Sequence, residues 1–270
     1  MIIVKASGEK TPFDLKKYQA SLARSGLTVA EAKEISNAIY QDLYTGISSS
    51  EIYRKTENWL KKNNRVVAAK YSLKRAIMAL GPSGFFFERY MSAVLKAYGY
   101  QTKVSQFLRG KCVEHEVDIV AERDGKKSMI ECKYHNTTGQ KSDVKVALYI
   151  QSRFLDLKDR HNFAGAVLVT NTLCTSEALQ YAKCVGMKII GWHYPMNGES
   201  LEHLIENKKL YPITVLPSLN KDTMRIFSNA GLVLVTDLIK FSPLLLARKF
   251  RLKQNLANTL FREATSLINS

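Results

Sequence analysis

The chain has 270 residues, 46% hydrophobic and 24% charged, so its composition is that of a globular protein with a sizeable core. No apolar run approaches the roughly 18 residues of a membrane span, and the N-terminus lacks a signal-peptide pattern. Four cysteines in this length do not make a disulfide framework, so we expect a cytoplasmic protein with reduced thiols and no membrane partner.

The net charge of +16 is unevenly distributed along the chain. Residues 1–80 and 208–270 each carry +7, whereas residues 81–207 carry only +2. Two basic ends around a nearly neutral middle favour a polyanionic partner. A protein that is basic without binding a polyanion remains the alternative interpretation.

The first 80 residues are predicted to be mainly helical. A short strand at Ile2–Ala6 and a turn at Ser7-Gly8-Glu9 come first, because Gly favours such a turn. Polar caps then precede apolar-periodic runs, which predict helices. The predicted helices lie near Asp14–Ser25, Thr28–Leu43, Ser50–Lys62 and Arg65–Leu80, and the Gly81-Pro82-Ser83-Gly84 breaker marks the first domain boundary.

Residues 81–205 have the alternating pattern of an α/β domain. The continuous apolar run Phe163–Thr170 predicts a strand buried on both faces. A helix at Ser176–Val185 and a strand at Met187–Trp192 complete a βαβ unit with parallel strands. The other predicted elements are a helix at Phe85–Tyr98, a strand near Gln101–Phe107, a hairpin over 116–133, and a helix at Ser142–Leu157 with Val144, Leu148, Gln151 and Leu155 on one stripe.

Residues 206–270 form the third predicted domain, which is basic and helical. Residues 195–216 connect it to the preceding domain through a short helix. A helix–turn–helix pair around Ala230-Gly231 would be able to seat a DNA backbone on its turn amides. A packed helical subdomain without a ligand is the alternative.

The hairpin contains the most informative residues of the chain. Asp124-Gly125 is a strong turn signal, and a turn there pairs residues whose numbers sum to 249. Asp118 then lies opposite Glu131, with the two side chains on one face and close together. Lys133 returns to the same face two residues later.

Two close carboxylates repel each other, and a divalent cation between them removes the repulsion and supplies a Lewis acid. The register therefore predicts a metal site at Asp118 and Glu131, with Lys133 beside it. A solvated, mixed-charge hairpin is the other interpretation, but charges are rare in apolar strands unless they are paired or metal-bound.

A zinc site is a competing possibility, because Cys112 and His115, and likewise Cys132 and His135, have zinc-ligand spacing. The predicted register places these side chains two on each face of the sheet, which disfavours a tetrahedral site. We expect His115 to pack against Tyr134 instead.

The segments 84–88 (GFFFE), 115–121 (HEVDIVA) and 130–133 (IECK) together resemble the PD-(D/E)xK nuclease core, in its Mrr-like restriction endonuclease branch. Residues 167–172, 178–186 and 189–192 match the back half of that core. The resemblance implies a mixed sheet flanked by helices and DNA cleavage that depends on Mg²⁺ or Mn²⁺. By the same resemblance Asp118 and Glu131 match the metal ligands, Lys133 the catalytic lysine and Glu88 the first-helix acid, while Gln151 falls near a helix glutamine.

The N-terminus resembles the ATP-cone, a regulatory nucleotide-binding domain, over 3–8 (IVKASG), 12–17 (PFDLKK) and 65–75 (RVVAAKYSLKR). Ala6 stands where that family usually has an arginine, which leaves open ATP, another nucleotide or no nucleotide. The resemblance implies that Lys5, Gly8, Phe13 and Lys17 line the nucleotide.

These features together predict a metal-dependent DNA endonuclease of restriction or defence type. Its expected domains are a nucleotide-binding regulatory domain (1–80), a nuclease domain (81–205) and a basic helical region (206–270). Cutting both DNA strands with one site per chain favours a dimer. A non-catalytic, nucleotide-responsive DNA-binding regulator and an RNA-processing nuclease are the alternatives.

Overall fold

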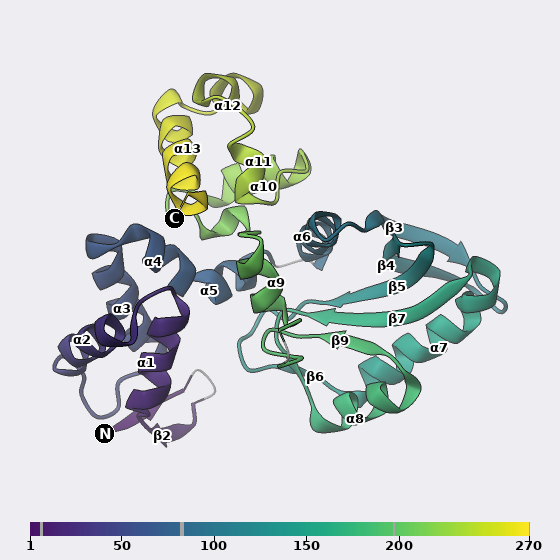
Figure 1. The fold of residues 1–270 in the computed structure, drawn as a ribbon, viewed down its shortest axis with the longest axis horizontal. Coiled ribbons are helices and arrows are strands. Elements are labelled where there is room, and N and C mark those ends of the chain that lie inside the picture. Colours follow the sequence, from purple (N-terminus) through teal and green to yellow (C-terminus); the bar gives the residue numbers. More distant parts are fainter. Residues whose placement is uncertain (6–7, 82–83, 197, 270) are drawn as a thin grey trace.

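The computed structural model of the chain describes residues 1–5, 8–81, 84–196 and 198–269. Figure 1 shows N-terminal helices (purple and blue), a central sheet with its helices (teal) and a C-terminal group of helices (yellow-green). Of the sequence positions discussed above, Ala6, Ser7, Pro82 and Ser83 lie outside the described residues.

The N-terminal elements are two short strands followed by five helices. Side chains of Asp14, Thr28 and Ser48 accept backbone hydrogen bonds at the starts of the first three helices, which explains where those helices begin. The bounds are β1 Ile2–Val4, β2 Lys10–Pro12, α1 Leu15–Arg24, α2 Val29–Tyr40, α3 Ser49–Asn63, α4 Arg65–Tyr71 and α5 Leu73–Met78.

The single helix expected over Arg65–Leu80 is wrong, because α4 and α5 are separate helices that meet at Ser72. The Ser72 hydroxyl donates to the Ala69 carbonyl at 3.0 Å, a local bond that competes with helix continuation. The break turns α5 toward the central sheet (Figure 1).

The central sheet is mixed and has five strands in the order β3-β4-β5-β7-β9. Strands β3, β4 and β5 are antiparallel, whereas β5, β7 and β9 run parallel, as the βαβ pattern predicts. The bounds are α6 Gly84–Ala97, β3 Gln101–Arg109, β4 Glu114–Arg123, β5 Lys126–Lys133, β6 Lys141–Ser142, α7 Val144–His161, β7 Phe163–Thr170, β8 Leu173–Cys174, α8 Ser176–Val185 and β9 Lys188–Ile190.

The register of the β4–β5 hairpin is the expected one from the turn to the Ile119–Ile130 pair, where the ladder ends one residue before the expected Asp118–Glu131 pair. Arg123 pairs with Lys126, and Ile119 pairs with Ile130. Asp124 and Gly125 both have positive φ, at 52° and 71°, which a tight hairpin turn of this kind requires.

Helix α7 buries a different face from the one expected. Leu148 and Leu155 are exposed, so the predicted stripe through Val144, Leu148, Gln151 and Leu155 is wrong. The buried face runs through Ala147, Ile150 and Leu157, whose spacing is equally helical. Arg153 lies on this face, three residues beyond Ile150.

The C-terminal part is helical, as expected. Helices α10 and α11 flank Gly231, whose φ of +79° permits the turn predicted there. The bounds are α9 Leu201–Asn207, a 3-10 turn at Ile213–Val215, α10 Lys221–Asn229, α11 Val235–Leu238, α12 Pro243–Phe250 and α13 Gln254–Ile268.

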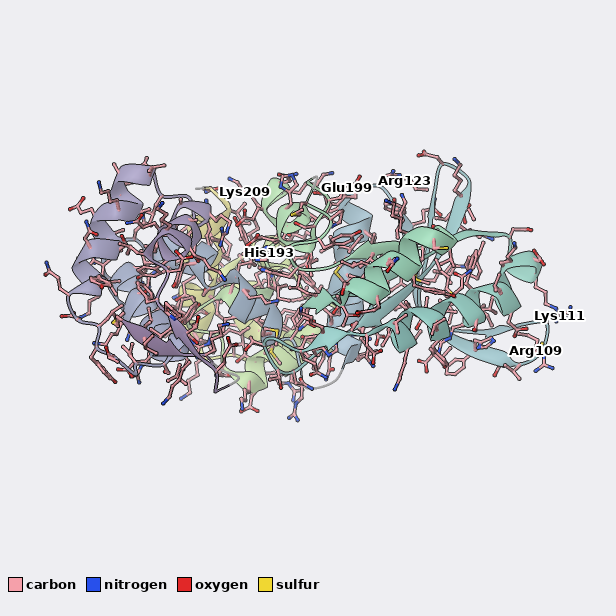
Figure 2. The ribbon with its side chains drawn as sticks, turned by 90° about the horizontal axis from the view of Figure 1, so that it is seen from below. Arg109, Lys111, Arg123, His193, Glu199 and Lys209 are labelled. Atoms are coloured by element: carbon pink, nitrogen blue, oxygen red, sulfur yellow. The ribbon has the colours of Figure 1, made fainter. Side chains whose placement is uncertain are left out.

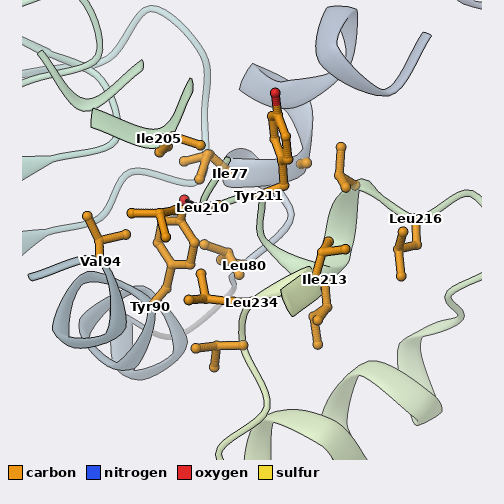
Figure 3. Packing of buried hydrophobic residues seen from close by; sticks show 14 of the residues in the cluster. Ile77, Leu80, Tyr90, Val94, Ile205, Leu210, Tyr211, Ile213, Leu216 and Leu234 are labelled. Carbon is orange, nitrogen blue, oxygen red and sulfur yellow. Dashed lines mark hydrogen bonds between the residues drawn. The ribbon is translucent and has the colours of Figure 1, made fainter. Parts of the chain in front are cut away.

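One hydrophobic core joins all three parts of the chain. Ile77 and Leu80 from the N-terminal part pack with Tyr90 and Val94 of α6 (Figure 3). The same cluster continues into Leu234 and the other buried residues of the C-terminal helices. A second cluster lies between the other face of the sheet and α7 and α8, and a third lies within the N-terminal helices.

Among the residues that the structure describes, no helix has both the length and the apolar character needed to cross a membrane.

Candidate active site

The hydrogen bonding between β4 and β5 involves a side chain one residue beyond the Ile119–Ile130 pair. There the Asp118 carboxylate accepts a 2.7 Å hydrogen bond from the backbone N–H of Cys132. At this point of the hairpin, the Asp118 side chain is the acceptor for a backbone N–H group of β5. The expected proximity of Asp118 to the Glu131 segment follows directly.

Glu131 lies near the end of β5, and its side chain is only 11% exposed. Burial, followed by the charge of Asp118, raises the pKa of its carboxyl to about 7. Its Oε1 lies 2.6 Å from Nη1 of Arg153 on α7. The raised pKa means that the folded protein favours the protonated form of Glu131, mainly because burial removes the carboxylate from water.

Glu88 joins the two strand acids from helix α6. Burial is the main cause that raises its pKa to about 7, and the charges of Asp118 and Glu116 add to it. Glu88 also contributes to the raised pKa of Glu131. The first-helix acid therefore lies within electrostatic reach of both hairpin carboxylates.

Lys133 is exposed and lies two residues beyond Glu131 on the same strand. Burial raises the pKa of Asp118, while the Cys132 N–H, Arg153 and Lys133 act to lower it. An exposed ammonium next to buried carboxylates is free to contact a substrate that approaches from solvent. The structure therefore brings Glu88, Asp118, Glu131 and Lys133 to one place.

Two residues of this cluster were not predicted from the sequence. Arg153 donates to the Glu116 carbonyl at 2.7 Å and to the Tyr149 hydroxyl at 2.6 Å, besides contacting Glu131. Glu116 adds a fourth negative charge near Asp118 and Glu88. A charged residue on the buried, 3.6-periodic face of α7 was the available signal for Arg153. Gln151, also on α7, is partly exposed.

The donor set suits a hard divalent cation. Carboxylate oxygens are the ligands that Mg²⁺ prefers, and Mg²⁺ commonly uses one or two of them together with water and phosphate. The buried Oε1 of Glu131 contacts Arg153 but has no partner with hydrogen-bond geometry among the described residues. No three His, Cys, Asp or Glu side chains form a ready cage in the described part of the chain. Asp118 and Glu131 thus fit a Mg²⁺-type site better than an all-protein cage.

The zinc alternative finds no support among the described residues. His115 lies 2.8 Å from Asp156, and His135 lies 2.9 Å from the Ser142 hydroxyl. The expected packing of His115 against Tyr134 is wrong. Tyr134 lies beyond the end of β5 and instead packs against Phe87 and donates to the Met78 carbonyl.

The four residues expected at a nucleotide lie in different surroundings. Lys5 and Gly8 share one turn, in which the Gly8 N–H donates to the Lys5 carbonyl and Lys5 pairs with Glu9 at 3.0 Å. Phe13 packs against Tyr18 in the N-terminal core, and Lys17 is exposed on α1. The structure thus places three of them near the surface of the β1–β2 turn and α1, and one partly inside.

Comparison with known families assigns each part of the chain. The restriction endonuclease family, in its Mrr catalytic form, matches residues 81–194, and the ATP cone domain matches residues 1–79. The fold and these matches define a restriction endonuclease-like protein with an N-terminal ATP cone. The family described as AF1548-like, C-terminal, matches residues 211–268.

One protein sequence and one solved structure are each similar to about two thirds of the chain. A protein of Archaeoglobus fulgidus, described as uncharacterized, is 40% identical over 178 residues, which are 66% of this chain and 99% of the relative. The crystal structure of AF1548, a protein of unknown function, has a TM-score of 0.62 at 38% identity and covers 69% of this chain and 99% of its own. The chain belongs to the AF1548-like family of restriction endonuclease-like proteins.

Proposed function

We propose that the protein is a metal-dependent DNA endonuclease of restriction type, a phosphodiester hydrolase that works in the cytoplasm. The observation that carries the proposal is the convergence of Glu88, Asp118 and Glu131 with raised carboxyl pKa values, next to an exposed lysine. A protein fold without catalytic activity gains nothing from acids that are buried near one another, because burying like charges costs stability. The match to the Mrr catalytic domain supports the same activity.

In this proposal Asp118 and Glu131 hold Mg²⁺ or Mn²⁺, which supplies Lewis-acid activation of water and of the phosphate. Glu88 supports the cation site from α6. Lys133 orients the nucleophile or stabilises the extra negative charge of the pentacovalent transition state. Arg153 fixes the Glu131 carboxylate from the opposite side through the 2.6 Å contact.

The N-terminal domain acts as a nucleotide-binding regulator in the same proposal. The ATP-cone match supports this role, and Lys5, Gly8, Phe13 and Lys17 are the proposed contacts, with ATP or another nucleotide as the effector. The basic ends of the chain would hold the DNA backbone, and a homodimer would place two active sites on opposite strands. We propose domain limits at residues 80 and 205.

Cleavage of plasmid DNA with Mg²⁺ or Mn²⁺, with EDTA as the metal-free control, tests the activity. Asp118→Asn and Glu131→Gln are expected to abolish cleavage and to leave DNA retardation in a gel intact. Asp124→Asn is the matched control, since Asp124 lies in the exposed turn of the same hairpin and Asn tolerates its positive φ. Cleavage that survives in both active-site variants would contradict the proposal.

A non-catalytic, nucleotide-responsive DNA-binding regulator is the second candidate. The Arg153–Glu131 pair favours it, because a protein cation already neutralises part of the charge that a metal would neutralise. DNA retardation without cleavage of DNA under any metal would select this function. Cleavage of RNA alone would instead assign the same chemistry to RNA processing.

A further inference from the structure

Phe107 on β3 is the most exposed aromatic side chain in the described part of the chain. Five phenylalanine and tyrosine residues are exposed there, and Phe107 is 66% exposed. The other four have partners, which are Phe13 for Tyr40, Glu51 for Tyr44, Arg89 for Phe85 and Arg153 for Tyr149. Among the described residues, no aromatic ring or cation packs on Phe107. Both faces of this ring are therefore available to a binding partner.

The backbone of β3 is irregular at Ser105, which has a φ of +49°. Val104 packs in the core cluster that includes α6, whereas Leu108 packs in the cluster beneath α7 and α8. In a regular strand these two residues would lie on one face, because side chains repeat every two residues. The neighbouring strand β4 changes face in the same way, since Ile119 belongs to the first cluster and Val117 to the second. Irregularities of this kind redirect the side chains that follow them.

This change of face brings Phe107 to the side of the sheet that carries the acids. Phe107 pairs with Glu116 in the β3–β4 ladder, and directly opposed residues project from the same face. After burial, which is the main cause, the charge of Glu116 contributes to the raised pKa of both Glu88 and Asp118. By the same register Ser105 lies across from Asp118, and Phe107 follows it by two residues, or about 7 Å. The ring therefore lies within roughly two nucleotides of a phosphate bound at the acids.

The surroundings of the ring favour an uncharged, flat partner. Glu116 is exposed opposite the ring, where its carboxylate would repel a phosphate. Arg109 is exposed two residues further along β3, on the same face, where its guanidinium would attract one. Figure 2 shows Arg109 and Lys111 at the same end of the molecule. A single ring among charged side chains differs from the continuous apolar patches of protein interfaces, but it suits a nucleobase with a phosphate on one side.

A continuous duplex offers little to such a ring, because its bases are paired and stacked on one another. An unpaired base presents a free face, on which aromatic side chains stack. We propose that Phe107 stacks on an unpaired base beside the scissile phosphate, so that the active site prefers DNA with unpaired bases to a continuous duplex. The preference in cleavage rests on the proposed nuclease function, whereas the stacking itself does not.

The fluorescence of a Phe107→Trp variant tests the stacking without cleavage. EDTA prevents metal-dependent cutting, and a base stacked on the introduced indole is expected to quench its emission. The emission of the natural tryptophans, Trp59 and Trp192, is measured in the wild type and subtracted. The probes are an oligothymidine single strand, a continuous duplex, and the same duplex with a central bulge of unpaired thymidines.

Quenching by the single strand or by the bulged duplex, but not by the continuous duplex, is the expected result. The comparison of the single strand with the bulge identifies whether the unpaired base comes from a free strand or from a distorted duplex. Equal quenching by every probe, or quenching by none, would overturn the proposal.

Binding by further variants distinguishes a base contact from a phosphate contact. Phe107→Ala is expected to weaken binding of DNA with unpaired bases by about tenfold, the loss of one stacked base, and binding of the continuous duplex by less than about twofold. Phe107→Tyr keeps the ring and should bind like the wild type. Arg109→Gln should weaken every probe alike, since each contains phosphates. Phe107→Ala that acts like Arg109→Gln, or that changes nothing, would contradict the base contact.

Leu155→Ala is the matched control, because it removes an exposed apolar side chain from α7, which covers the other face of the sheet. Its affinity for every probe should equal that of the wild type. A loss of affinity equal to that of Phe107→Ala would mean that apolar surface in general, rather than this ring, binds the DNA. That result would overturn the proposal.

Cleavage assays separate this inference from the proposed function. A single-stranded circular phage DNA and the relaxed duplex circle of the same sequence offer the same sites. With Mg²⁺, the wild type is expected to cut the single-stranded circle, the bulged duplex or both at least about fivefold faster than continuous duplex DNA. Phe107→Ala is expected to remove that preference.

The possible failures are distinct. Cleavage by the wild type without a preference for unpaired bases would overturn this inference and leave the nuclease function standing. Selective quenching in Phe107→Trp by DNA that the wild type never cuts would overturn the nuclease function and keep the base contact.

Discussion

The Arg153 guanidinium on α7 and the Glu131 carboxylate on β5 are in contact, with Nη1 and Oε1 2.6 Å apart, and both side chains are nearly buried. Arg153 thus reaches from helix to sheet and meets the acid that is proposed to bind the metal. Removing one member of a buried pair leaves the other charge uncompensated, which is usually more costly than the pair is worth.

Arg153→Met is therefore expected to lower the stability of the metal-free protein by about 3 kcal/mol. It should also raise the pKa of Glu131 further, because the nearest positive charge is lost. If a divalent cation binds beside Glu131, then Mg²⁺ should raise the Tm of the variant more than that of the wild type. Differential scanning fluorimetry with and without Mg²⁺ measures both effects. Arg160→Met, at an exposed position of the same helix, is the control; an equal loss there would refute the role of the ion pair.

Glu131→Gln should become more stable relative to wild type as the pH rises. The folded-state pKa of Glu131 is about 7, above its usual value of 4.5, so the folded protein holds this proton more tightly than the unfolded chain. The contribution of Glu131 to the free energy of unfolding of the wild type therefore decreases between about pH 4.5 and 7. The glutamine variant does not titrate and does not lose this stability. The advantage should reach on the order of 3 kcal/mol by pH 8. Urea unfolding at pH 5 and pH 8 measures it; a difference that does not change with pH would rule out the raised pKa.

Asn171→Ala should destabilise the protein by about 3 kcal/mol, since it leaves the buried N–H and carbonyl of His135 without their partner. Because His135 follows Lys133 closely, plasmid cleavage should also fall at least tenfold. Asn37→Ala on the exposed surface of α2 is the comparison variant and should be nearly neutral. Chemical unfolding and cleavage rates are the two measurements. A stable variant with normal cleavage would show that Asn171 does not position the end of β5.

Asp156→Ala should loosen the loop between β3 and β4. Asp156 accepts hydrogen bonds from the N–H groups of Cys112 and Val113, and it also contacts His115 at 2.8 Å. Figure 2 places Lys111 of this loop at one end of the molecule. Trypsin should cut the variant faster after Lys111 than the wild type, as followed by mass spectrometry. The control is Asp159→Ala, at an exposed position of the same helix, which trypsin should cut at the wild-type rate. If the Asp156 variant were also cut at the wild-type rate, the Asp156 carboxylate would have no role in holding the loop.

Local signals predicted much of the fold. The Asp124-Gly125 turn established the β4–β5 register without any long-range information, because a one-residue shift would turn every side chain to the other face. The strand at Phe163–Thr170 and the helix at Ser176–Val185 were found with their observed bounds, since apolar runs and caps mark both ends. The placement of Asp118, Glu131 and Lys133 near one another followed from the hairpin alone.

The features that were not predicted from the sequence depend on interactions that a local sequence pattern does not reveal. Arg153 meets Glu131 only because α7 packs across the sheet, and that packing depends on which of two possible apolar stripes is buried. The break at Ser72 likewise depends on a competition between a local side-chain bond and helix continuation. The roles of the acids, the lysine and the nucleotide contacts remain predictions that the experiments above test.

The shared core of Ile77, Leu80, Tyr90 and the C-terminal helices has a consequence for how the protein unfolds. Each of the three parts covers apolar surface that belongs to the others, so none can separate without exposing that surface to water. The protein should therefore lose these parts in a single cooperative transition. Any regulation of this molecule then acts within one cooperative unit. A small displacement of the N-terminal helices would disturb the packing of the C-terminal helices in the shared core.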